Sequence, residues 1–200
     1  MAAKRAKNAK RSRTAVRSRK PAKAKTAKSK TAAGAPAKSR VAPDDAALRR
    51  DLVELLRGGG AHLTLDAALQ DLPAELRGVT PPGAPHSSWQ LLEHLRIAQR
   101  DILEFSRNPQ HVSPEFPAGY WPATVAPPDD AAWDASVQAF RADLAAMEGL
   151  VTSPAANLLA RFSHGDGQTL AREAMLLADH NAYHLGQLVV VRQLLGAWKG

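Results

Sequence analysis

The sequence predicts an all-α protein: a four-helix bundle over residues 43–200, preceded by a disordered basic N-terminal tail over residues 1–42. Four segments of the bundle domain repeat apolar residues at helical spacing, and loops rich in Pro and Gly separate these segments. No segment keeps the alternation of a half-buried strand between hairpin turns. Several amphipathic helices joined in this way are typical of a bundle.

The first helix is expected from Asp44 to Arg57. Two acidic residues, Asp44 and Asp45, stand at the positive end of the helix dipole, and three glycines from Gly58 onward form a stop signal. Residues 64–78 (TLDAALQDLPAELRG) are shorter and contain a proline, so we expect one or two broken helical turns there.

The second helix is expected from a capping box at Ser87–Gln90 to about Arg107, because a Ser followed three residues later by Gln can satisfy the first backbone N–H groups. Residues 108–130 follow with six prolines. This loop is too long for a simple connection, and long loops often serve function. Residues 157–165 (NLLARFSHG) are a candidate for a short extended piece.

The third helix is expected to start on Asp129 or Asp130 and to fade at Gly149, and the fourth to run from about Thr169 to Ala197. In the fourth helix eight residues alternate at intervals of four and three, which is a heptad seam that faces the core. The seam consists of Leu170, Ala174, Leu177, Asn181, His184, Leu188, Val191 and Leu195.

Three histidines are predicted to converge between the second and fourth helices. His184 belongs to the seam, and His180 lies one turn earlier on nearly the same face. His94 lies beside the apolar seam of the second helix. Neutral imidazole binds Zn, Ni, Fe or Cu, and a three-His site leaves a position open for water or substrate. The alternative is a group of hydrogen-bonded core histidines, each of which needs partners for both ring nitrogens.

One familiar metal-site class is excluded. In zinc proteases the helix reads H-E-x-x-H, and its Glu is the general base. Here Asn181 follows His180, so that base is absent.

Two segments of the chain, residues 86–105 and 164–188, resemble the DinB-like superfamily, which includes YfiT-type metal-dependent hydrolases and thiol transferases. The H-x3-H-x-G-Q signature of that family is present as His180, His184, Gly186 and Gln187. The resemblance extends over about residues 44–198.

This resemblance implies a four-helix bundle, often a homodimer, that holds a divalent metal ion (Zn, Ni or Fe) by His94, His180 and His184. It further implies a metal-dependent thiol S-transferase or hydrolase. The chain has no cysteine, so a low-molecular-weight thiol would have to be a co-substrate. A non-catalytic stress-response metal-binding protein and a nucleoid-associated protein are the alternative functions.

Several residues near the three histidines have two interpretations each. Glu173, Gln187 and Gln90 either orient a ligand imidazole or are ordinary surface or contact residues. Gly186 lies in mid-helix, where glycine costs about 1 kcal/mol relative to Ala. It therefore indicates close packing or room for a ligand, unless it is simply tolerated. Asp179 is expected at the surface.

The remaining aromatic residues and histidines lie in predicted loops. Tyr120 and Trp121 either cap the mouth of the site or pack over the end of the bundle. His86 and His164 are near helix starts and could approach the open end of the site, although helix capping or plain loop polarity is the favoured explanation. His62 and His111 show no pattern.

The predicted tail and the predicted bundle differ in charge. Residues 1–40 contain fifteen Lys or Arg and no Asp or Glu, whereas the remaining residues contain twelve Lys or Arg and nineteen Asp or Glu. Such a tail favours nonspecific contact with nucleic acid, or it is a solubilising extension or a transit peptide. The lack of cysteine, of a long apolar run and of a secretory signal predicts a cytoplasmic protein without membrane contact.

Overall fold

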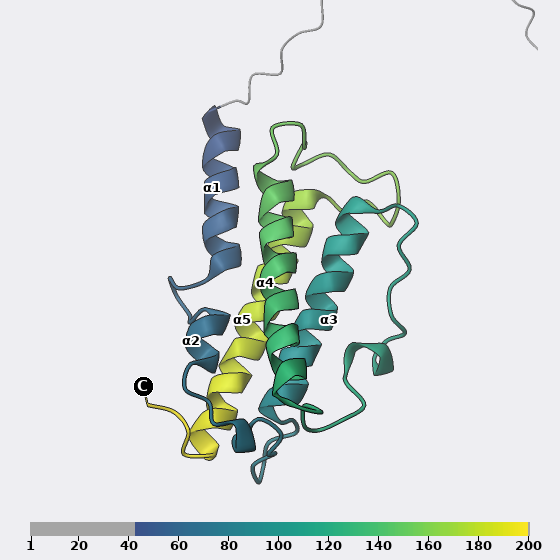
Figure 1. Cartoon of the computed structure of the whole chain (residues 1–200). Coiled ribbons are helices and arrows are strands. Elements are labelled where there is room, and N and C mark those ends of the chain that lie inside the picture. Colours follow the sequence, from purple (N-terminus) through teal and green to yellow (C-terminus); the bar gives the residue numbers. More distant parts are fainter. Residues whose placement is uncertain (1–42, 200) are drawn as a thin grey trace, which may run out of the picture. The chain divides into compact units, whose positions relative to one another are not determined.

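The computed structural model of the protein describes residues 43–199, and the predicted tail lies outside these residues. The described chain is helical, as predicted, and contains no strand beyond an isolated bridge between Arg161 and Thr169 (Figure 1). That bridge falls at the short extended piece that the sequence indicates. The elements are α1 (Pro43–Arg57), α2 (Leu65–Leu69), a 3-10 turn η1 (Ala74–Leu76), α3 (Ser88–Arg107), a 3-10 turn η2 (Ala118–Tyr120), α4 (Asp130–Thr152) and α5 (Leu170–Leu194).

The helix starts are where the capping signals place them. The Ser87 side chain accepts from the Gln90 backbone N–H, and the Gln90 side chain accepts from the Ser87 N–H, which completes the predicted capping box of α3. Asp129 caps α4 and Thr169 caps α5 in the same manner. Each cap satisfies a backbone donor that the first helical turn leaves free.

Two helix ends differ from the prediction. α4 continues past Gly149 to Thr152, because Val151 in this last turn is fully buried and its burial offsets the low helix propensity of glycine. α5 ends at Leu194 instead of Ala197. The cause is Gly196, whose positive φ of 67° stops the helix and places its N–H on the carbonyl of Gln193.

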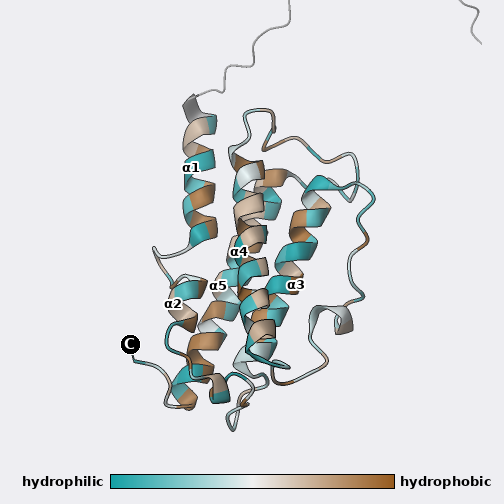
Figure 2. Ribbon diagram, in the orientation of Figure 1, coloured by the Kyte–Doolittle hydropathy of each residue, from teal (hydrophilic) through white to brown (hydrophobic). Residues whose placement is uncertain are grey.

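The heptad seam of α5 faces the bundle core as predicted. Its members are buried from Leu170 to Val191, and only Leu195 is half-buried. Apolar and polar residues both occur along each of the long helices (Figure 2). Two apolar clusters fill the core. One contains Trp89, Leu95 and Leu188, and the other contains Leu103, Met147 and Leu177.

A layer of polar contacts connects α3, α4 and α5 inside the bundle. Gln99 of α3 donates to the backbone carbonyl of Phe140 in α4 at 2.6 Å, and its side-chain oxygen accepts from Asn181 of α5 at 3.1 Å. His184 lies one turn after Asn181 on α5, so the histidines are next to this layer along the helix. A buried polar layer of this kind fixes the relative positions of helices through specific bonds.

Candidate metal centre

The structure brings His94 of α3 together with His180 and His184 of α5. Nε2 of His94 lies 3.1 Å from Nε2 of His184 and 3.2 Å from Nε2 of His180. The three side chains form a group whose ligand atoms all lie within 4.8 Å of one another, so they can hold a metal ion. Three nitrogens bound tetrahedrally to zinc at about 2.0–2.1 Å would lie roughly 3.3 Å apart. The measured separations fit that geometry.

Hydrogen bonds on the far side of two rings determine which nitrogen carries the proton. Nδ1 of His94 donates to the backbone carbonyl of Tyr120 at 2.8 Å, and Nδ1 of His184 donates to Oε1 of Gln187 at 2.8 Å. A neutral imidazole has only one N–H, so Nε2 of both rings is a lone-pair acceptor. Two lone pairs that face each other at 3.1 Å repel unless a cation lies between them.

The third ring is also neutral near pH 7. Burial, followed by the charges of the neighbouring His184 and His94, lowers the pKa of His180 to about 4. Burial is the main cause of the lowered pKa of His94 and His184 as well. Nδ1 of His180 is buried without a hydrogen-bond partner. Neutral imidazoles are the form that coordinates a metal, so protons do not compete strongly at this site.

The long loop between α3 and α4 covers one side of the site. Trp121 stacks on the ring of His94 with centroids 4.0 Å apart and an interplanar angle of 5°. His86 stacks on Trp121 in turn at 3.9 Å. Of the two interpretations of Tyr120 and Trp121, the structure supports the cap over the site, because the first contacts His94 through its carbonyl and the second through its ring.

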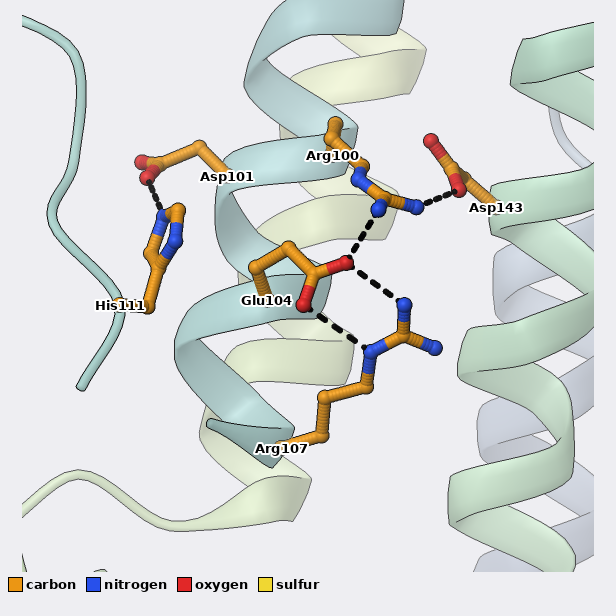
Figure 3. A network of polar contacts seen from close by, with 6 residues as sticks. All are labelled: Arg100, Asp101, Glu104, Arg107, His111 and Asp143. Atoms are coloured by element: carbon orange, nitrogen blue, oxygen red, sulfur yellow. Dashed lines mark hydrogen bonds and ion pairs between the residues drawn. The ribbon is translucent and has the colours of Figure 1, made fainter. Parts of the chain in front are cut away.

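Asp101 of α3 anchors this loop. Its carboxylate accepts from the Tyr120 hydroxyl at 2.6 Å and from Nε2 of His111 at 2.7 Å. Burial, followed by the bond to this carboxylate, raises the pKa of Tyr120 to about 12, so the hydroxyl keeps its proton. Figure 3 shows Asp101 and His111 on one side of α3, and the ion pairs of Arg100 and Arg107 on the other.

Sequence reasoning missed Asp101 and His111. Asp101 follows His94 by seven residues, a spacing that puts both on one face of a helix, and this signal could have identified it. His111 lies in an irregular loop, where no sequence periodicity predicts the direction of its side chain.

Some of the residues with two interpretations lie away from the metal centre. Gln90 serves the capping box, and buried Glu173 pairs with Arg172. Asp179 is exposed, as predicted. A Cβ added at Gly186 would meet no atom within 4 Å, so close packing within this chain does not explain that glycine. Gln187, by contrast, contacts His184 directly.

The remaining two loop histidines occupy different surroundings. His86 lies beside the site and stacks on Trp121. His164 donates to the carbonyl of Phe105 at 2.7 Å and stacks on Phe162, so in the structure it fastens a loop.

An all-α bundle with three inward-facing imidazoles on two helices defines a class of helical proteins with a candidate metal centre. The chain belongs to the DinB superfamily, because the model of that family matches residues 61–188, which is more than half of the chain. The match includes all three histidines. No curated protein and no solved structure matches the chain. No helix among residues 43–199 has the length and apolar character that crossing a membrane requires.

Proposed function

We propose that His94, His180 and His184 are the ligands of a divalent metal ion, Zn, Ni or Fe. One observation supports this most strongly: the Nε2 atoms of His94 and His184 face each other at 3.1 Å, while the hydrogen bonds at Nδ1 of both rings leave these Nε2 atoms as acceptors. If Nε2 of His180 donates a proton to Nε2 of His94, that contact becomes a hydrogen bond. The repulsion between the Nε2 atoms of His94 and His184 stays unrelieved. A cation shared by the three nitrogens satisfies all of them at once.

The residues around the ligands fit this role. The carbonyl of Tyr120 and the amide of Gln187 accept from the outer nitrogens of two ligand rings, which orients the rings and increases their basicity. Three protein ligands are typical of catalytic sites, in which a further position stays open for an exogenous molecule. When bound there, a divalent ion supplies the Lewis acidity that lowers the pKa of a thiol or of water.

We further propose that the protein is a metal-dependent thiol S-transferase or hydrolase. Because the chain has no cysteine, the thiol would come from a low-molecular-weight co-substrate. The alternative is a non-catalytic metal-binding protein with the same three ligands. Homodimer formation and nucleic-acid contact through residues 1–40 stay predictions, and the latter falls outside the described residues.

The metal content of purified protein tests the first proposal. Wild type, His184→Ala and His62→Ala are expressed in medium supplemented with Zn, Ni and Fe, and the bound metals are measured by elemental analysis. We expect about one equivalent in wild type and in the His62 control, whose ring hydrogen-bonds the neighbouring Leu63 carbonyl and is not part of the three-His group, and a large loss in His184→Ala. A metal-free wild type would contradict the site.

Activity tests the second proposal. Metal-loaded and metal-free wild type are assayed with small thiols and electrophilic acceptors, and separately with hydrolysable esters and amides. Turnover that requires the metal and is lost in His184→Ala supports an enzyme. Full metal occupancy without turnover in either panel would favour the non-catalytic alternative.

A further inference from the structure

A cavity of about 370 Å³ opens directly onto the three histidines. All three imidazoles line it. The other lining residues come from α3, from the loop between α3 and α4, and from α5: Ala98, Asp101, Ile102, Phe116, Tyr120 and Leu176. Its volume lies within the usual range of small-molecule sites, roughly 300–1,000 Å³. An exogenous molecule that reaches the histidines through this cavity would contact these walls.

The walls are apolar apart from the histidines, the carboxylate of Asp101 and the Tyr120 hydroxyl that is bonded to it. Both oxygens of Asp101 are already engaged, one by the Tyr120 hydroxyl and the other by His111. No Lys or Arg stands among the described residues that line the cavity. Away from the metal ligands, a charged group would find no free counter-ion on the described walls, whereas an alkyl or aryl group would gain from burial.

Two apolar side chains at the cavity are left open to solvent. Phe116 of the loop is 82% exposed, and Leu176 of α5 is 37% exposed. They belong to different elements and line the same cavity. A ligand between them would bury apolar surface that the folded chain leaves in water.

We propose that this cavity binds the apolar part of a neutral ligand whose donor atom coordinates the metal held by the three histidines. The substrate class is therefore a compound with a small metal-binding head and an alkyl or aryl group, not a polyanionic one. This inference rests on the proposed metal centre. It adds the chemical class of the ligand that would occupy the open coordination position of the metal.

Cobalt(II) substitution tests the metal centre and the cavity separately. Metal-free full-length protein is titrated with Co²⁺, and the visible absorption bands report occupancy of the site. The loaded protein is then titrated with 1-methyl-, 1-butyl- and 1-hexylimidazole, which share one neutral head and differ in the length of the alkyl group. We expect the dissociation constant to fall about threefold to fourfold for each buried methylene.

Variants locate the contact. Leu176→Ser and Phe116→Ser should keep Co²⁺ binding and methylimidazole affinity but flatten the dependence on chain length. Both side chains are partly or largely exposed, so neither change opens a buried core. Val190→Ser is the matched control on α5, because Val190 is 50% exposed and lines a different apolar cavity. Val190→Ser should keep the wild-type dependence of affinity on alkyl chain length.

The possible results separate the two proposals. Co²⁺ binding with no dependence on chain length, or with the same dependence in Leu176→Ser and wild type, would overturn the apolar cavity and leave the metal centre intact. No Co²⁺ bands in wild type would overturn both. A stronger effect of Val190→Ser than of Leu176→Ser would assign the alkyl group to the other cavity and would overturn the inference.

Discussion

Nδ1 of His94 donates a 2.8 Å hydrogen bond to the backbone carbonyl of Tyr120, a residue of the long proline-rich loop. This bond holds the His94 proton on the outer nitrogen and directs the Nε2 lone pair toward α5. The loop thus does more than connect α3 to α4. Its backbone selects the tautomer that a metal ligand requires, and its conformation is coupled to the candidate centre.

Gln187→Leu is expected to weaken metal binding about 10- to 100-fold, because the substitution removes the acceptor that orients His184. Competition with a chromogenic chelator measures the affinity. Gln193→Leu, an exposed change further along the same helix, is the control and should leave the affinity unchanged. Equal affinities in the two variants would show that the amide does not position His184.

Asp101→Asn is expected to lower the free energy of unfolding by about 1–3 kcal/mol, since an amide cannot accept both of the hydrogen bonds that hold the loop. Chemical denaturation measures the loss, and metal affinity should fall with it because the Tyr120 carbonyl is held less firmly. Tyr120→Phe, which keeps the carbonyl, should cost stability with a smaller effect on the metal.

Glu104→Gln is the control for this pair of variants. Glu104 lies one turn after Arg100 and pairs with Arg100 and Arg107, whose side chains are 50% and 38% exposed. Ion pairs of exposed arginines contribute about 0–1 kcal/mol, so this variant should lose less stability than Asp101→Asn. If Glu104→Gln lost more free energy of unfolding than Asp101→Asn, the ion pairs would stabilise this region more than the hydrogen bonds of Asp101 to the loop do.

Metal-free protein is expected to become less stable as the pH falls from about 6.5 toward 4. The pKa of His180 is 6.5 in the unfolded chain and about 4 in the fold, so within this interval the unfolded state binds the additional proton. The contribution is complete above pH 6.5 and is on the order of 1–3 kcal/mol. Denaturation at a series of pH values measures it. His180→Gln should reduce the slope, and an unchanged slope would contradict the buried neutral ring.

Gly186→Ala is expected to stabilise the chain by about 0.5–1 kcal/mol. Gly186 is exposed in mid-helix with no atom near its missing Cβ, so alanine gains helix propensity without a clash. Thermal unfolding measures the change. A clear destabilisation would indicate that another molecule, such as a second copy of the chain, packs against this glycine.

Local sequence signals predicted the helices and much of the candidate site. Capping residues such as Ser87 and Asp129 act on the backbone within three residues of themselves, so their effect is readable from the chain. Heptad spacing likewise placed His184 inside the bundle and His180 one turn away. These are short-range periodic constraints. The convergence of the three histidines was predicted from them, and metal binding stays a proposal.

The contacts between residues that are distant in the sequence were decided by tertiary structure alone. The carbonyl of Tyr120, the anchor between Asp101 and His111, and the stack of Trp121 on His94 depend on how an irregular loop folds back onto α3. Irregular backbone has no period, so its side chains cannot be assigned to a face in advance. Sequence by itself determined which helices present imidazoles. Long-range packing determined the hydrogen bonds at two of these rings and the apolar cavity that all three rings line, because both depend on residues far apart in the chain.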